Sequence, residues 1–483
     1  MTQILSLLRV EPQIRDEPRL SPIQKLPLEI LQHIMALSVP SITDNLYHKD
    51  KWTVPLEPGE PHPDSVIETL WEVSYYWRDA LRTTPEVWST IILDDLHTSR
   101  SSKFGRCISL SKQRPLDIYI APCGLYVNRT IMALFRRCAK RIKRLYLAIR
   151  FSFSPRDPFL VGLLDHLQTD GPFPALSALC VNANSEADIP LLQTSQLDLP
   201  NLQSLMLGSF TRDIFRLTTT MTWSSIRRLC LEFHYAAPGR TDGLTYLSQC
   251  ANLDHLRITL PCYPIMPINT PMLLPSLTYL RLRARNDEGG SSLLQALWLP
   301  QLHHFSLQYE YFLERFNPVA TLDALLKVRA NNLQRLSISG LILDGTSLQS
   351  QFANLPDLTR LEIHNCKIRV PFFQTFAVED EFHKMECLLI SQSSFDIIDM
   401  TNLLAVWDLE RPQGQSKPSV ELRPKRKKDP NSGLYETIQS RHPHIVKLLD
   451  QTQSIPPGHI GPVSSLFGLR SYRIRGGLQP AQM

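Results

Sequence analysis

Apolar residues recur along most of the chain at positions 1, 4 and 6 of a six-residue unit. In LTRLEI, for example, Leu358, Leu361 and Ile363 hold these positions. Ten such units occur between Ile142 and Met385, with a mean spacing of 27 residues over nine steps. Positions 4 and 6 alternate as in a half-buried strand, and position 1 would pack the turn below it. The ten triplets are Ile142/Leu145/Leu147, Leu176/Leu179/Val181, Leu202/Leu205/Leu207, Ile226/Leu229/Leu231, Leu253/Leu256/Ile258, Leu277/Leu280/Leu282, Leu302/Phe305/Leu307, Leu333/Leu336/Ile338, Leu358/Leu361/Ile363 and Met385/Leu388/Ile390.

A single strand of this kind cannot bury its own apolar face, whereas stacked neighbours bury each other's. The pattern therefore predicts an α/β solenoid at 104–395, with a parallel sheet on the concave face and helices or irregular segments outside. Packed helices are the alternative, but regular spacing with a helix breaker before half of the strands argues against them. These breakers are prolines two residues ahead of the first apolar position, at Pro174, Pro200, Pro275, Pro300 and Pro356.

Weaker patterns flank the ten units. RPLDIYI (114–120) alternates like a strand, and 129–140 reads as a helix. KPSVELRP (417–424) favours one more strand, within a C-terminal cap and tail at 396–483. The end of this region, after Gln451, is rich in proline and glycine, so we expect it to be mobile.

The N-terminal part has helical rather than strand periodicity. In LPLEILQHIMALS (26–38), Pro27 suits the first helical position, and Ile30, Leu31 and Ile34 belong to a broad apolar stripe. This stripe predicts a first helix.

A second helix is predicted further along. Ser65 and Glu68 have the spacing of a capping box. Thr84 and Pro85 suit the start of a short third helix carrying Val87 and Trp88. The residues that place the second helix on one continuous face, at spacings of four, three, four and four, are Val66, Leu70, Val73, Trp77 and Leu81.

These segments, LPLEIL, VSYYWRDAL and TPEVW, resemble the F-box. The N-terminal arrangement is similar to F-box proteins with leucine-rich repeats, of the kind abundant in mushroom-forming (basidiomycete) fungi. The repeat pattern resembles the leucine-rich-repeat family, and LEIHNC (361–366) carries the Asn/Cys position of its longer repeats. The resemblance divides the chain into a tail at 1–20, an F-box-like module at 21–95 with an insertion at about 41–63, the solenoid, and the C-terminal region. Ser74 stands where the family often has Cys.

The resemblance implies a substrate-recognition subunit of a Skp-cullin-F-box ubiquitin ligase, with the F-box docking a Skp-type adaptor, and through it a cullin. Such a receptor is not an enzyme and needs no cofactor. For Leu70 and Leu81 a core role is favoured, and for Pro27, Ile30 and Ile34 a contact role. The residues that the resemblance places on or beneath the docking surface are Leu26, Pro27, Ile30, Leu31, Ile34, Val73, Trp77, Leu81 and Trp88. The alternative is a repeat scaffold without a ubiquitin role, whose N-terminal helices cap the solenoid.

Composition adds few constraints. A net charge of +5 with 20% charged residues gives no global nucleic-acid or membrane-surface signal. The nine cysteines lack CxxC spacing, which favours reduced thiols and a cytoplasmic or nuclear location. No apolar run reaches the roughly 18 residues of a membrane span.

Common phosphate, nucleophile-elbow and zinc motifs are missing, so we expect no catalytic or metal site. RPKRKK (423–428) fits either a nuclear signal or a solvated basic loop.

The residues between and beside the inward leucines point to the concave face. Acids are few there, chiefly Glu232 and Glu362. Because arginine with tyrosine suits carboxylates and phosphates, the sequence predicts that this face binds an acidic or phosphorylated protein segment, although the arginines could merely keep an exposed sheet soluble. The predicted substrate-binding residues are His255, Arg257, Tyr279, Arg281, Arg283, His304, Arg335, Arg360 and His364.

Overall fold

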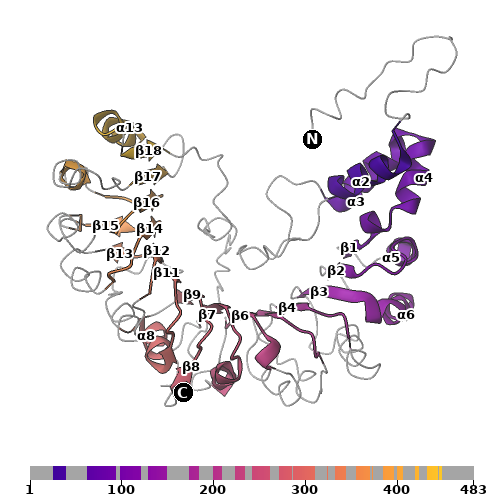
Figure 1. Cartoon of the computed structure of the whole chain (residues 1–483), viewed down its shortest axis with the longest axis horizontal. Helices are drawn as coiled ribbons and strands as arrows, with labels where there is room; N and C mark the ends of the chain where they lie inside the picture. The colour runs from indigo at the N-terminus through magenta and orange to yellow at the C-terminus, as the bar shows by residue number, and fades with distance from the viewer. Residues whose placement is uncertain are drawn as a thin grey trace, which may run out of the picture.

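The chain forms an arc of stacked repeats with helices at one end (Figure 1). The computed structural model describes residues 26–39, 62–93, 98–120, 129–149, 173–183, 199–208, 223–233, 242–260, 271–284, 287–309, 324, 332–343, 355–369, 372–373, 384–395, 400–405, 419–423, 432–443 and 445–448. The tail at 1–20, most of the insertion at 41–63, most of the basic run at 423–428 and the segment after Gln451 lie outside these residues.

One parallel sheet runs along the inner side of the arc (Figure 1). Its neighbours follow the order of the chain, so each repeat adds one strand beside the previous one. The fourteen strands are β1 (Thr90–Leu93), β2 (Leu116–Ile120), β3 (Ile142–Ile149), β4 (Ala178–Ala183), β5 (Ser204–Gly208), β6 (Arg228–Glu232), β7 (His255–Thr259), β9 (Tyr279–Ala284), β11 (His304–Tyr309), β12 (Arg335–Ser339), β14 (Arg360–His364), β16 (Cys387–Ser391), β17 (Ser419–Arg423) and β18 (Val446–Leu448).

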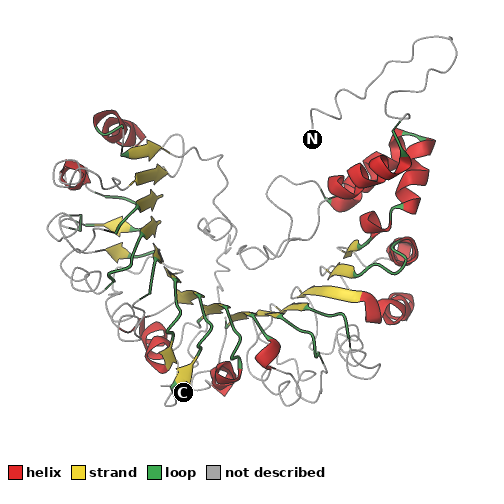
Figure 2. Ribbon diagram, viewed as in Figure 1, coloured by secondary structure: helices red, strands yellow, loops and turns green. Residues whose placement is uncertain are grey.

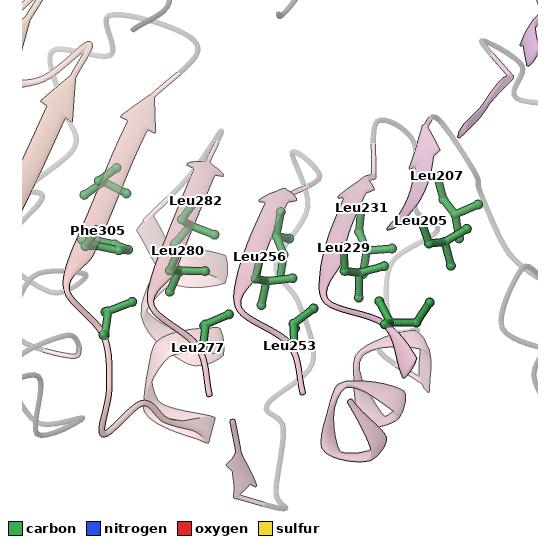
Figure 3. Close-up of a cluster of buried hydrophobic side chains, with 14 of the residues drawn as sticks. Leu205, Leu207, Leu229, Leu231, Leu253, Leu256, Leu277, Leu280, Leu282 and Phe305 are labelled. Carbon is green, nitrogen blue, oxygen red and sulfur yellow. The ribbon is translucent and has the colours of Figure 1, made fainter. Parts of the chain in front are cut away.

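All ten predicted units supply a strand to this sheet, from β3 to β16, so the solenoid prediction is confirmed. The strands predicted at 114–120 and 417–424 are β2 and β17. Every residue of the ten apolar triplets is at most 5% exposed. In Figure 3, Leu256, Leu280 and Phe305 stand side by side on successive strands, as their register requires. Each buried leucine of this kind contributes roughly 1.5–3 kcal/mol through removal from water.

A four-residue turn precedes the strands and explains the prolines. The amide of Leu277 donates to the carbonyl of Leu274, and that of Leu358 to Leu355. Pro275 and Pro356 are therefore second in their turns, a position that the fixed φ of proline favours. Pro275 and Pro300 follow the short strands β8 (Met272–Leu273) and β10 (Leu297–Trp298), so these two prolines do not end a preceding helix as expected. The first residue of the turn is a further buried repeat position, which the sequence pattern did not reveal: Phe173, Leu199, Trp223, Cys250, Leu274, Leu299 and Leu355.

Asparagine side chains link successive repeats at the same turn. The side-chain amide of Asn201 donates to the carbonyl of Pro174 at 2.7 Å. Asn252 makes the equivalent bond to Ser224 at 2.7 Å, and Asn332 to Pro300 at 3.0 Å. Each asparagine directly precedes the first apolar residue of its unit, so these bonds staple the turn to the repeat before it.

Left-handed backbone ends three consecutive strands. Gly340 (φ 78°), Asn365 (φ 47°) and Gln392 (φ 56°) directly follow β12, β14 and β16. At Gly340 a Cβ would lie 2.4 Å from the carbonyl oxygen of Tyr309, so only glycine fits there. Beyond these turns, β13 (Ile342–Leu343) pairs with β15 (Lys367–Ile368), and earlier β8 (Met272–Leu273) pairs with β10 (Leu297–Trp298).

Helices lie on the outer, convex side of the arc (Figure 2). The predicted helix at 129–140 is α6 (Arg129–Cys138), followed by the 3-10 turn η4 (Ala139–Arg141). The other outer elements are α5 (Thr98–Leu110), η7 (Trp223–Ser225), η8 (Asp242–Gln249), α8 (Asp287–Ala296) and α13 (Ser432–Arg441).

The N-terminal helices are α2 (Leu28–Ser38), α3 (Pro63–Val73), α4 (Tyr75–Thr83) and the 3-10 helix η3 (Pro85–Trp88). Two sequence expectations for the second helix were wrong. It begins at Pro63 and is capped by the ring of His62, because Nδ1 accepts from the amide of Asp64, so Ser65 and Glu68 form no capping box. It also breaks at extended Ser74, whose hydroxyl accepts from the amide of Trp77 and starts a new helix.

Smaller differences concern the other two helix starts. Pro27 stands one residue before α2, and its carbonyl accepts from the amides of Ile30 and Leu31. Thr84 makes no side-chain cap to η3, since its hydroxyl donates back to the carbonyl of Ala80 at 2.7 Å.

The sheet is longer than the predicted range of 104–395 at both ends. It begins at β1, directly after η3, and continues through β17 to β18. Buried residues of α2, α3 and α4 form one apolar cluster with the core beneath the sheet. The N-terminal helices therefore close that end of the core.

Candidate binding surfaces

Exposed apolar side chains concentrate on the N-terminal helices. Among the described residues, eight large apolar side chains are exposed, and six of them lie between Leu28 and Tyr75. Ile30, Ile34 and Leu37 are 49%, 39% and 73% exposed. Their spacing of four and three residues puts them along one side of α2, which we call the apolar helix face. This face has no cover among the described residues.

The predicted adaptor-binding residues divide into two groups. Leu31, Trp77, Leu81 and Trp88 are at most 4% exposed and belong to the core. This fits the preference for a core role at Leu81, and Leu70 is likewise buried. The others, Pro27, Ile30, Ile34 and Val73, are exposed, with Leu26 half-buried.

The buried group holds the exposed group in place. The indole nitrogen of Trp88 donates to the carbonyl of Leu81 at 2.8 Å, which ties η3 to α4. The hydroxyl of Tyr76 donates to the carbonyl of Leu26 at 3.1 Å, which ties α4 to the start of α2. Because the Tyr76 bond spans 50 residues of sequence and the Trp88 bond fixes η3 on α4, the apolar helix face is presented by a fixed support.

A small cavity of about 180 Å³ lies where these helices meet the solenoid. Its lining includes Asp64, Trp71, Trp88 and Lys103, and the ammonium of Lys103 pairs with the carboxylate of Asp64. The two indole rings meet edge to face, with centroids 6.4 Å apart. The ion pair between α3 and α5 thus joins the helical module to the first outer helix.

Strand register sorts the concave side chains of β6 to β14 into three rows. The first row contains the first residue of each strand, and the middle and third rows follow at intervals of two residues. The first row is Arg228, His255, Tyr279, His304, Arg335 and Arg360; the middle row is Cys230, Arg257, Arg281, Ser306, Ser337 and Glu362; the third row is Glu232, Thr259, Arg283, Gln308, Ser339 and His364.

The three rows differ in burial. All six residues of the first row are half-buried. In the other rows, predicted binding residues Arg257, Arg281 and Arg283 are 3–6% exposed. Arg257 lies 3.4 Å from the carboxylate of Glu232, and Arg281 donates to the amide oxygen of Gln308 at 2.8 Å. Of the predicted cationic strip, the first row and the half-buried His364 of the third row are therefore the accessible part.

A carboxylate organises the β12–β14 end of these rows. Glu362 is fully buried, accepts a hydrogen bond from the guanidinium of Arg360 at 2.6 Å and forms an ion pair with that of Arg335 at 2.5 Å. The ring of His364 lies 3.6 Å from the same carboxylate, and Glu421 lies 3.8 Å from Arg360. Burial lowers the pKa of Arg360, but the hydrogen bond to Glu362 raises it. The net change is a rise in pKa, so this guanidinium stays charged.

Three rings form the centre of the first row. His255 stacks on Tyr279 with centroids 5.4 Å apart and planes at 21°. Tyr279 meets His304 edge to face at 4.6 Å. Asp254, one residue before β7, holds Nδ1 of His255 at 2.8 Å. Parallel register brings these three residues, about 25 residues apart along the chain, into one contiguous group.

Chemically reactive groups are few in the described part of the chain. Its seven cysteines are buried thiols. Burial raises the pKa of the Cys107 thiol to about 11 and those of Cys138, Cys250 and Cys366 to about 12, so these thiols are protonated at neutral pH. No group of three or more potential metal ligands occurs among the described residues, and none of their helices is long and apolar enough to cross a membrane.

One parallel strand per repeat, at a mean spacing of 27 residues and with buried LxxLxL positions, defines a leucine-rich-repeat solenoid. No protein-family model matches the chain, and no curated protein matches it.

Solved structures with some likeness include two internalins from Listeria monocytogenes. The internalin inlF has 12% identity and a TM-score of 0.34, with 73% of this chain and 78% of that chain covered. The internalin C2 (inlC2) has 18% identity and a TM-score of 0.25, with 51% and 81% covered.

Proposed function

We propose that the chain is the substrate-recognition subunit of a Skp-cullin-F-box type ubiquitin ligase, in which the N-terminal helices dock the adaptor and the solenoid binds a target protein. The observation that carries the proposal is the apolar helix face on α2. An uncovered row of large apolar side chains on a helix is the usual mark of a surface that docks in a partner's groove.

The division between buried and exposed residues supports this role. Leu31, Trp77 and Trp88 secure the module, while Ile30 and Ile34 are free to enter a groove. A receptor of this kind acts by proximity: holding a target near a ubiquitin-loaded enzyme raises the effective concentration of the target lysine. It needs no nucleophile of its own.

Co-purification with a Skp-type adaptor tests the proposal. Ile30→Glu combined with Ile34→Glu should lower the amount of captured adaptor at least tenfold, because charged groups cannot enter an apolar groove. Leu273→Glu is the matched control, since Leu273 is 45% exposed but lies on β8, within the solenoid. Thermal unfolding should be unchanged in both variants. Equal capture by wild type and the double variant, or no capture by wild type, would contradict the proposal.

A repeat scaffold without a ubiquitin role is the second candidate. It is favoured by the continuity of η3 with β1, which makes the N-terminal helices a cap on the core. Capping uses the buried side of the helices, whereas docking would use the exposed side. If wild type captures no adaptor while its solenoid still binds a protein partner, the scaffold is the better description.

A further inference from the structure

Charged side chains on the concave face are most concentrated on one block of strands. The three rows on β6 to β14 contain six arginines and two glutamates. The corresponding positions on the preceding strand, β5, are Ser204, Met206 and Gly208. Those on the following strand, β16, are Cys387, Leu389 and Ser391. One or two uncharged strands on each side therefore separate the positive block from the next charged positions, Arg144 on β3 and Glu421 with Arg423 on β17.

The accessible edge of this block is the first row. Its guanidinium groups stand at the two ends, on Arg228 and on Arg335 with Arg360, and its rings stand between them. The buried arginines of the middle row, Arg257 and Arg281, lie two residues further along β7 and β9. They add positive potential where charge is poorly screened, and Glu232, 3.4 Å from Arg257, offsets part of it. A ligand in contact with the first row is therefore selected for negative charge.

The rings make a base-stacking ligand a poor fit. His255, Tyr279 and His304 already contact one another along the row, at centroid distances of 5.4 and 4.6 Å. Adjacent strands are fixed about 4.8 Å apart by their hydrogen bonds, so a planar base cannot slide between the rings. A single-stranded nucleic acid would lose the stacking that normally drives its binding.

Resting on the function proposed above, we propose that the first row is the recognition line for an extended acidic segment of the target, which crosses β6 to β14. Six strands at about 4.8 Å give a line of roughly 24 Å, the length of about seven extended residues at 3.3 Å each. Carboxylate or phosphate groups of the segment meet the arginines at the ends, and the phenol and imidazole edges supply hydrogen-bonding groups between them.

Peptide binding to the purified full-length chain tests this proposal. The probes are a fluorescein-labelled octapeptide of alternating glutamate and serine, the same peptide with phosphorylated serines, and an octamer of uridine. Both acidic peptides should bind, and the tighter one identifies carboxylate or phosphate as the preferred anion. Arg228→Glu should weaken peptide binding at least tenfold. Arg227→Glu, an exposed neighbour outside the first row, should change it less than twofold.

Tyr279→Ala removes the ring at the centre of the row and should weaken binding about fivefold, with circular dichroism confirming an intact fold. The proposal is overturned if neither acidic peptide binds, if Arg228→Glu and Arg227→Glu have equal effects, or if the RNA binds more tightly than the peptides. Capture of the adaptor tests the proposed function separately. If the chain captures the adaptor but binds no acidic peptide, only the recognition line is contradicted. If it binds acidic peptide but captures no adaptor, only the ligase role is contradicted.

Discussion

The solenoid and the N-terminal helices differ in how far their apolar side chains are buried. In the solenoid, all three apolar positions of every repeat unit are at most 5% exposed, because each strand is covered by the next. On α2, three large apolar residues are at least 39% exposed while Leu31 and Met35 are fully buried. Self-burial accounts for the repeat positions of the first region, and the exposed Leu273 and Trp298 lie outside them on β8 and β10. The second region leaves apolar surface that packing among the described residues does not cover.

The largest expected effect comes from opening the repeat core. Leu280→Ala removes a fully buried side chain between Leu256 and Phe305, and should lower the free energy of unfolding by about 2–5 kcal/mol. Ile34→Ala on α2 should cost less than about 0.5 kcal/mol, because the side chain already contacts water. Urea unfolding followed by circular dichroism measures both. Similar costs would mean that the apolar helix face is covered in solution.

A backbone constraint inside the solenoid comes next. Gly340→Ala forces a side chain into left-handed backbone and against the carbonyl of Tyr309, so it should cost about 2–3 kcal/mol. The control is Asn365→Gly at the equivalent turn one repeat later, which should be neutral or slightly stabilising. Thermal unfolding distinguishes them. A harmless Gly340→Ala would show that the repeats tolerate more backbone adjustment than the structure indicates.

Two buried tryptophans of the helical module differ in whether the indole nitrogen donates a hydrogen bond, and we expect their substitutions to differ in stability. Trp88→Phe loses the bond to the carbonyl of Leu81 and should cost about 1 kcal/mol. Trp77→Phe should lie within about 0.5 kcal/mol of wild type, because the buried indole nitrogen of Trp77 has no hydrogen-bond acceptor among the described residues. Unfolding monitored by tryptophan fluorescence and circular dichroism gives both values. The reverse order would place the stabilising contact of the module elsewhere.

The smallest effect is expected at the asparagine staples between repeats. Asn252→Ala removes one side-chain bond to the carbonyl of Ser224 at an exposed position and should cost about 0.5 kcal/mol. Asn252→Asp keeps the shape but loses the donor, so it should cost about the same. Equilibrium unfolding with repeated measurements resolves a difference of this size. A native stability for the aspartate variant would assign the role to shape instead of hydrogen bonding.

The sequence predicted the sheet well because alternation and spacing are local properties. LTRLEI shows which residues of β14 face the core without knowledge of any other repeat, and the same reading succeeded for all ten units. The break at Ser74 was missed for a local reason too. The new helix resumes in phase, so Val73, Trp77 and Leu81 keep the spacing of a continuous helix across the interruption.

The candidate sites depend on contacts that a linear pattern does not contain. Arg257 and Arg281 read as exposed concave residues, but their burial depends on Glu232 and Gln308, which arrive from neighbouring repeats. The resemblance favoured a contact role for Ile30, but the burial of the adjacent Leu31 depends on how α2 meets α4, which the sequence pattern does not contain. The turn residue three positions before each unit varies from Phe173 to Cys250, which hid its common role.

The direct passage from η3 into β1 has a geometric consequence. Because only Ser89 separates Trp88 from the first strand, the helices and the sheet have little freedom to swing relative to each other. The number of strands between two points then fixes the distance between them along the sheet. Tyr279 lies on the eighth strand of the sheet, seven steps from β1, or roughly 34 Å along the arc at about 4.8 Å per step. Adding or deleting one repeat before β6 would shift a ligand bound at Tyr279 by one strand spacing relative to the N-terminal helices. It would also rotate the ligand by the angle between adjacent strands.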